Sequence, residues 1–152
     1  MYIPTFDDVE TAQERIKPYI YKTPVLTSSF MNELSGAELF FKCENFQKAG
    51  VFKVRGASNA VFGLSEEKAV KGVATHSSGN HALSLAYAAG RRGIPVTVVM
   101  PHTALESKKL RCTDTGAALW SVNPVPHRVK KQLRKLSQSP ERILCIRTMT
   151  RA

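Results

Sequence analysis

Two short stretches of the sequence hold side chains that could do covalent chemistry. The first, ENFQKAGVFKVRGASNA, covers residues 44–60 and places Lys53 directly after Phe52, with a glycine on either side. The second, THSSGNHA, covers residues 75–82 and gathers hydroxyl, amide and imidazole groups around a glycine. A lysine amine can attack a carbonyl group, and hydroxyls near a helix start can help to hold an anion. Each stretch has to be weighed both as a reactive site and as ordinary structure.

Lys53 falls at or near the start of a predicted helix that runs from Phe52 to about Leu64, with apolar residues recurring every three or four positions. The positive end of that helix and partial burial beside Phe52 both favour a neutral amine, which Schiff-base chemistry needs. The flanking Gly50 and Gly56 would let the chain turn and pack tightly. The alternative is a surface lysine whose stem lies on the core while its amine reaches water, the commoner arrangement for a single lysine.

Ser77, Ser78 and Gly79 form a predicted turn between a strand at 72–76 and a helix at 80–91. Backbone N–H groups at a helix start are unpaired and carry partial positive charge, so such a turn favours an anion. The turn matches neither the G-x-x-x-x-G-K-[ST] phosphate loop nor the G-x-G-x-x-G dinucleotide motif. The alternative is a tight strand-to-helix turn in which a serine caps the helix.

The surrounding pattern predicts an α/β protein with a parallel sheet. Strands at 72–76 and 94–100 alternate with helices at 80–91 and 103–113, and such alternation produces parallel strands with right-handed crossovers. We expect the last helix to open with a capping box of Thr103 and Glu106. The elements expected earlier in the chain are a helix opened by a capping box of Thr5 and Asp8, an extended segment at 22–26, a short helix from Ser28 or Ser29 to about Gly36, a strand at 39–43 and a loop at 45–50.

The composition is that of a globular protein, with 43% hydrophobic and 22% charged residues. The net charge of +10 invites a nucleic-acid-binding role, but residues 116–152 alone carry eight Lys/Arg against one Asp/Glu. No apolar run is long enough to span a bilayer and no signal-peptide pattern opens the chain, so we expect a cytoplasmic protein without membrane contact. The cysteines and histidines show no disulfide or metal-ligand spacing, so we expect no metal site.

The two reactive stretches, together with TPVLTSS near the start and the later GIPVTVVMP, resemble the serine/threonine ammonia-lyase (dehydratase) and serine racemase branch of the fold-type II pyridoxal-phosphate enzymes. The resemblance covers about residues 3–119. It implies the N-terminal half of a three-layer, tryptophan-synthase-β-like α/β fold with a parallel sheet. Residues 1–71 would form the part of the large domain that carries the cofactor lysine, 72–119 a small-domain βαβα unit, and 120–152 an atypical basic tail.

The resemblance also implies a role for each reactive residue. Lys53 would bind the aldehyde of pyridoxal 5′-phosphate and then act on the Cα proton, while Ser78 would be the acid/base on the opposite face. Phe52 would pack near the cofactor ring, and Asn80 would hydrogen-bond its phenolic oxygen. The loop expected to hold the substrate carboxylate consists of Ser77, Ser78, Gly79, Asn80 and His81.

The implied activity is deamination of a β-hydroxy amino acid, such as L-serine, L-threonine or 3-hydroxyaspartate, to a 2-oxo acid and ammonia, with racemisation as another outcome. A homodimer is implied for the full-length family. The alternative is a non-catalytic basic fragment that binds nucleic acid or a full-length partner subunit, although the nearly balanced charge of residues 1–115 argues against nucleic acid. Leu83 departs from the family pattern, which argues against regulation by ATP. The resemblance would place the ATP contacts near Ser28, Ser29 and Lys48.

The likeness is expected to stop after Leu119, because residues 120–152 show no periodic pattern. If the codons for residues 120–124 are read two bases later, they can encode ECEP. Codons for residues 142–151, read with the same offset, can encode ADLVHPYNDP. Both peptides resemble the sequence that follows this point in the family. We hypothesise a frameshifted, truncated copy with weak cofactor binding and little activity, because the family's phosphate loop, its residue facing the pyridine nitrogen and its cation site lie further on. The alternative is a genuine basic tail. The hypothesis fails if no single-base slip near codon 119 restores the family sequence.

Overall fold

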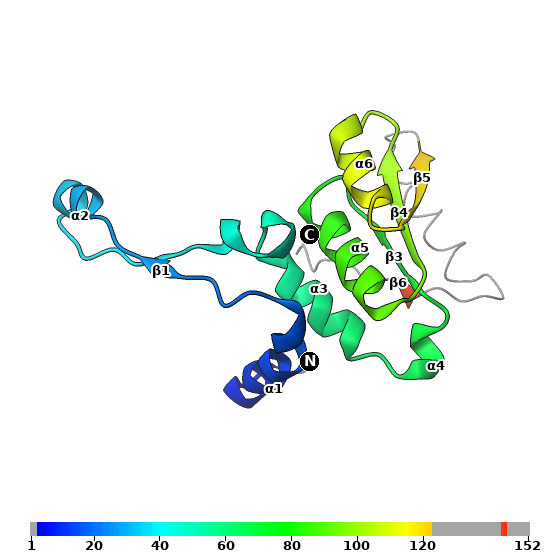
Figure 1. Ribbon diagram of the computed structural model, residues 1–152, viewed down its shortest axis with the longest axis horizontal. Coiled ribbons are helices and arrows are strands. Elements are labelled where there is room, and N and C mark those ends of the chain that lie inside the picture. Colours follow the sequence, from blue (N-terminus) through cyan, green and yellow to red (C-terminus); the bar gives the residue numbers. More distant parts are fainter. Residues whose placement is uncertain (1–2, 123–143, 146–152) are drawn as a thin grey trace.

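The computed structural model of the chain describes residues 3–122 and 144–145 (Figure 1). The first helix, α1 (Phe6–Ile16), opens with the predicted capping box, in which the Thr5 backbone N–H donates to Asp8 Oδ2 at 2.7 Å. A single 3₁₀ turn, η1 (Lys17–Tyr19), follows it. The prediction for this segment is therefore confirmed.

A projecting segment follows, which we call the arm and define as residues 25–42 (Figure 1). It consists of β1 (Val25–Leu26), α2 (Ser29–Ser35) and β2 (Phe41–Lys42), and its strands pair antiparallel. The predicted short helix is confirmed: Ser28 Oγ accepts the Met31 N–H, and Gly36 ends the helix with a φ of 67°. The strand predicted at 39–43 is shorter, because only two of its residues pair with β1.

The chain then returns to the body of the molecule through two 3₁₀ turns, η2 (Glu44–Phe46) and η3 (Lys48–Gly50), where the sequence predicted a loop. Helix α3 (Lys53–Phe62) comes next and ends where the Gly63 N–H donates to the Asn59 carbonyl at 3.0 Å. A four-residue helix, α4 (Glu66–Ala69), was not predicted, because one turn is too short to show a periodic pattern.

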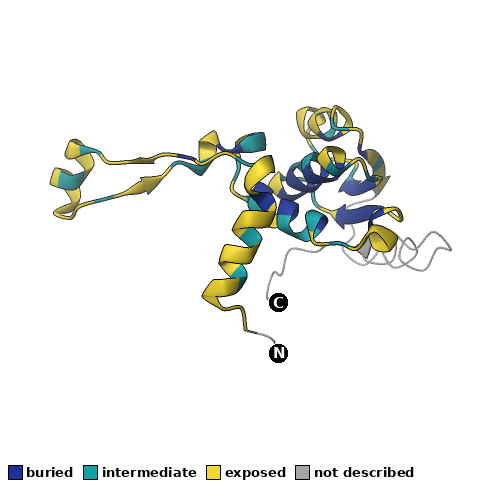
Figure 2. Cartoon of the chain, turned by 60° about the horizontal axis from the view of Figure 1, so that its bottom comes forward, coloured by how far each residue is buried: buried dark blue, intermediate teal, exposed yellow. Residues whose placement is uncertain are grey.

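The main sheet of the described residues is parallel, with strand order β5-β4-β3-β6. Its elements in chain order are β3 (Val73–His76), α5 (Asn80–Arg92), β4 (Val96–Pro101), α6 (Glu106–Thr113), β5 (Ala118–Val122) and β6 (Leu144–Cys145). Fully buried Leu85 and Val98 lie in one hydrophobic core together with Val61, so α3 packs into the same core as the sheet. Figure 2 shows this buried centre beside the exposed arm. The predicted α/β class with a parallel sheet is confirmed.

The capping box expected at Thr103 is wrong. Residues 101–104 form a turn instead, in which the Ala104 N–H donates to the Pro101 carbonyl at 2.9 Å. Helix α6 therefore begins at Glu106, with Leu105 at the N-cap position and no side-chain cap. Strand β5 also runs across residue 119, where the sequence placed a boundary, and its pairing with β4 extends the sheet to Val122.

No helix in the part of the chain that the structure describes is long and apolar enough to cross a membrane. The residues between 123 and 143 and after 145 lie outside the described part, and so do most of the expectations for the basic tail.

Candidate active site

Lys53 is the first residue of α3, and its backbone is set by a sharp change of chain direction just before it. Ala49 and Gly50 both adopt a left-handed backbone, with φ of 57° and 71°, and Val51 is extended. The half-buried side chain of Lys53 lies beside the exposed ring of Phe52, with Nζ 5.3 Å from the ring centroid. The expected need for Gly50 at the turn is therefore supported, because only glycine adopts such a φ without strain.

The expected tight packing at Gly56 is wrong. A Cβ atom added at Gly56 would meet no heavy atom within 4 Å. This glycine instead borders a groove of about 450 Å³ between α1 and α3, whose lining also includes Val9, Ile16 and Arg55. Neither Lys53 nor the serine-rich turn lines that groove, so we do not assign it to the reactive site.

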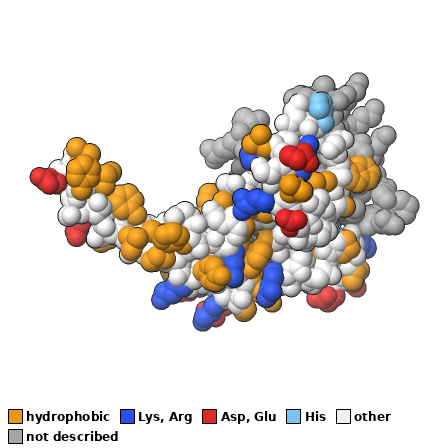
Figure 3. All heavy atoms as spheres, turned by 45° about the horizontal axis from the view of Figure 1, so that its top comes forward, with side chains coloured by type: hydrophobic (Ala, Val, Ile, Leu, Met, Phe, Trp, Pro, Cys, Tyr) orange, Lys and Arg blue, Asp and Glu red, His pale blue; other side chains and the backbone are white. Residues whose placement is uncertain are grey.

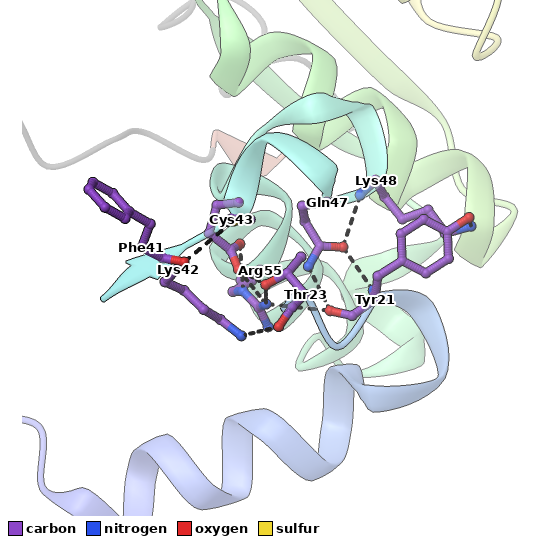
Figure 4. A network of polar contacts seen from close by, with 9 residues as sticks. Tyr21, Thr23, Phe41, Lys42, Cys43, Gln47, Lys48 and Arg55 are labelled. Carbon is purple, nitrogen blue, oxygen red and sulfur yellow. Dashed lines mark hydrogen bonds and ion pairs between the residues drawn. The ribbon is translucent and has the colours of Figure 1, made fainter. Parts of the chain in front are cut away.

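An ion pair anchors the first turn of α3, two residues beyond Lys53. Arg55 donates from Nε and Nη2 to the two carboxylate oxygens of Glu44, at 2.8 and 2.7 Å. The Thr23 hydroxyl donates to the same carboxylate at 2.6 Å (Figure 4). The hydrogen bond from Arg55, assisted by Thr23 and opposed by desolvation, lowers the pKa of Glu44 from 4.5 to about 2. The carboxylate is therefore charged throughout the ordinary pH range and holds α3 to the segment before it.

A buried glutamine fixes the other side of the same junction. The side-chain amide of Gln47 pairs with the Tyr21 backbone in both directions: Nε2 donates to the carbonyl and Oε1 accepts the N–H, each at 2.8 Å (Figure 4). Lys48 Nζ lies 3.8 Å from the centroid of the Tyr21 ring and donates to its hydroxyl. Lys42 Nζ donates to the Thr23 carbonyl at 2.7 Å. These contacts hold residues 21–23 against the loop that leads into Lys53.

Glu44, Gln47 and Arg55 all belong to the first stretch, but the sequence alone predicted no role for them. Glu44 and Arg55 are 11 residues apart, and Gln47 reaches back 26 residues to Tyr21. No periodic spacing marks such pairs. The available signal was only the mixture of charged and amide side chains with apolar residues in this stretch.

The serine-rich turn connects β3 to α5 as predicted. The Ser77 N–H donates to the Val99 carbonyl at 3.2 Å, and the Gly79 N–H donates to Ser77 Oγ at 3.2 Å. Ser77, Ser78 and Gly79 are half-buried, and Asn80, the first residue of α5, is exposed. His81 is buried.

The start of α5 distinguishes the two interpretations of this turn. Gly79 occupies the N-cap position, so neither serine is the N-cap residue and the N-cap residue has no side chain with which to cap the helix. The Ser77 hydroxyl oxygen accepts the Gly79 N–H and therefore stabilises the turn itself. A Cβ atom added at Gly79 would meet nothing within 4 Å, so there is space beside the turn. This combination fits an anion site better than a serine-capped helix.

Helices α3 and α5, which begin at Lys53 and Asn80, lie side by side and share one core, to which Ala57 and Leu85 contribute (Figure 1). The turn η3, just before Lys53, also contacts α5. The described contact of the Lys53 side chain, however, is with the Phe52 ring, and the described hydrogen bonds of Ser77 and Gly79 go to other partners. The structure thus pairs Phe52 with Lys53 and gathers residues 77–81 in one turn, while a site shared by both groups stays a prediction.

The fold and these two groups define a class of protein: the chain belongs to the pyridoxal-phosphate dependent enzymes, whose family model matches residues 16–150. Enzymes of this family use pyridoxal 5′-phosphate, and the fold is that of the fold-type II members.

Particular relatives can also be named. The chain is 60% identical over 124 residues to β-hydroxyaspartate dehydratase of Paracoccus denitrificans, a match that covers 82% of this chain and 39% of that protein. It is 47% identical over 146 residues to mouse serine racemase, covering 94% of this chain and 43% of the racemase. The structure of maize serine racemase superposes with a TM-score of 0.93 at 40% identity, covering 98% of this chain and 45% of that one. The chain therefore spans about two fifths of the length of these relatives.

The expectation that the likeness stops after Leu119 is wrong. The family model matches up to residue 150, and the match to mouse serine racemase is too long to end at Leu119. Two described parts of the chain beyond that point, the end of β5 and β6, both pair in the parallel sheet. The frameshift stays a hypothesis that only the coding DNA tests.

Proposed function

We propose that this chain contributes the lysine and the carboxylate-binding turn of a pyridoxal-phosphate site that acts on a β-hydroxy amino acid. The observation that carries the proposal is the start of α5, where a turn of two serines and a glycine leads into a helix whose N-cap residue is the glycine itself. Such a helix start suits the carboxylate of an amino acid. The names of the relatives, a β-hydroxyaspartate dehydratase and serine racemases, support this class of substrate.

The residues present fit the cofactor. Lys53 offers a half-buried amine at the start of a helix, with the apolar ring of Phe52 beside it. Open space borders Gly79, and Asn80 is exposed at the helix start, where its amide can donate to the phenolic oxygen of the cofactor. When bound, pyridoxal phosphate supplies an electron sink that stabilises negative charge at the substrate Cα.

The chain's own groups would then divide the work. Lys53 binds the cofactor aldehyde through its amine and afterwards moves the proton at the substrate Cα. The backbone N–H groups at the start of α5, together with Ser77, Ser78 and His81, bind and orient the carboxylate. The Ser78 hydroxyl is the second acid/base. Loss of the Cα proton and of the β-hydroxyl group as water would give an enamine, whose imine tautomer is hydrolysed by water to a 2-oxo acid and ammonia. Return of a proton to Cα from the Ser78 side would instead give the other enantiomer.

We propose elimination rather than racemisation, because the dehydratase of Paracoccus is 60% identical over the matched region. For the same reason 3-hydroxyaspartate is the first substrate to test. The homodimer implied by the resemblance and the cytoplasmic location expected from the sequence stay predictions.

Reductive trapping tests the assignment of Lys53 without requiring turnover. The chain is incubated with pyridoxal phosphate, reduced with borohydride and mapped by peptide mass spectrometry. Lys48, five residues earlier and also half-buried, is the matched comparison. We expect Lys53 to carry the adduct in large excess over Lys48, and Lys53→Ala, but not Lys48→Ala, to remove most of it. An even spread of adducts over surface lysines, with Lys53 labelled no more than Lys48, would contradict the assignment. A lack of adduct on any lysine is instead the result expected from weak cofactor binding by a truncated copy. A 2-oxo acid assay with 3-hydroxyaspartate, L-serine and L-threonine then tests the reaction class separately.

A further inference from the structure

The arm exposes far more apolar surface than a protein normally leaves in water. Its exposed side chains include Val25, Leu26, Phe30, Leu34, Phe40 and Phe41. Figure 2 shows the arm as almost wholly exposed, and Figure 3 shows hydrophobic side chains along its length. A contiguous apolar surface of this kind marks an interaction site.

The arm has little to hold its own shape. Its two strands pair over two residues each, and the seven-residue α2 buries none of its residues. An isolated helix of that length is marginal in water, and so is an isolated two-stranded hairpin. The polar anchors lie at its base, where Lys42 Nζ donates to the Thr23 carbonyl and the Cys43 N–H to the Pro24 carbonyl. A partner that covers the apolar residues would supply the missing stabilisation.

The charge of the arm excludes two kinds of partner. Its charged residues are Glu33, Glu38 and Lys42, and Lys42 already bonds to a carbonyl. A nucleic acid or an anionic bilayer would require a basic surface here. The arm is instead apolar and slightly acidic, which fits a protein surface.

The comparison of lengths identifies that surface. Nearly all of the chain, 98%, superposes on maize serine racemase with a TM-score of 0.93, so the arm holds the place it has in a longer chain. More than half of that longer chain lies outside the match. We propose that the apolar face of the arm is the surface that binds this remaining part of the family fold. The arm should bind that part even when the part is supplied as a separate polypeptide. The proposal does not rest on the proposed function, because it requires no reaction.

Co-expression tests the proposal. The tagged 152-residue chain is produced together with an untagged polypeptide that comprises the part of Paracoccus β-hydroxyaspartate dehydratase outside the match. The test variant is Phe30→Ser with Leu34→Ser on α2. The matched control is Val70→Ser with Leu105→Ser, outside the arm; all four side chains are between 64 and 72% exposed. Circular dichroism of each purified variant confirms that it is folded.

We expect the wild-type chain and the control to capture the untagged polypeptide in a 1:1 ratio, and the arm variant to capture at least tenfold less. Hydrogen exchange in residues 25–42 should slow on capture. Equal capture by both double variants would overturn the proposal, as would an untagged polypeptide that stays insoluble or uncaptured beside the folded wild-type chain. The proposal would also be overturned if this chain forms a homodimer and Phe30→Ser with Leu34→Ser abolishes it. In that case a second copy of the chain covers the arm.

Discussion

Replacing Glu44 by Gln tests whether one ion pair fixes the start of the lysine-bearing helix. The Glu44 side chain is 19% exposed, and its carboxylate accepts two hydrogen bonds from Arg55. A folded-state pKa of about 2 against an ordinary value of 4.5 corresponds to roughly 3 kcal/mol, at about 1.4 kcal/mol per pKa unit. Arg55 is partly open to solvent, and screening by water reduces the expected contribution to about 1–2 kcal/mol.

The pH dependence of this contribution has a definite sign. Because the folded-state pKa is depressed, the ion pair stabilises the fold fully above about pH 4.5, and its contribution is lost as the pH falls toward 2. We therefore expect Glu44→Gln to lower the free energy of unfolding by about 1–2 kcal/mol at pH 7. The difference from wild type should shrink steadily between pH 4.5 and 2. Urea unfolding followed by the fluorescence of Trp120, the single tryptophan and part of β5, measures both effects.

Glu66→Gln is the matched control. Glu66 also accepts a hydrogen bond from an arginine, Arg92 Nη2 at 2.7 Å, but its side chain is almost fully exposed. Exposed ion pairs contribute little, so this variant should unfold close to wild type at pH 7. The reasoning fails if the two variants lose equal stability, or if the gap between Glu44→Gln and wild type stays constant down to pH 2.

Two further predictions concern backbone conformation, and urea unfolding measures both. Ala49 has a left-handed backbone, which costs a residue with a Cβ atom about 1 kcal/mol, so Ala49→Gly should stabilise the chain. An unchanged or lower unfolding midpoint would contradict this prediction. Gly72 and Gly36 both have positive φ, but a Cβ atom at Gly72 would lie 2.6 Å from the Pro95 carbonyl oxygen, while Gly36 borders open space. Gly36→Ala should therefore cost about 1 kcal/mol and Gly72→Ala more than about 2 kcal/mol; equal losses would show that the contact is relieved by a shift of the chain.

The sequence predicted the elements whose signals are local. The capping box of Thr5 and Asp8 and the alternation of strands and helices between 72 and 113 were recognisable because each depends on residues a few positions apart. The same rule failed at Thr103, where the spacing to Glu106 was correct but Pro101 accepts a hydrogen bond from the Ala104 N–H and closes a turn first. A capping pattern predicts a helix start only where the preceding chain is free to extend.

The reactive residues were recognisable from the sequence, whereas the contacts that position them were not. Lys53 and the serine-rich turn stand out by residue type, but the Glu44–Arg55 pair and the clamp of Gln47 on Tyr21 become visible only in three dimensions. Both contacts come from the stretch that also carries Lys53. Their partners, at residues 21–23, form the base from which the arm extends. These contacts connect the base of the arm directly to the segment that precedes Lys53. Binding of a partner to the arm should consequently slow hydrogen exchange at the Tyr21 amide as well as within the arm. If only the amides of the arm become protected, the arm and the segment before Lys53 are not structurally coupled.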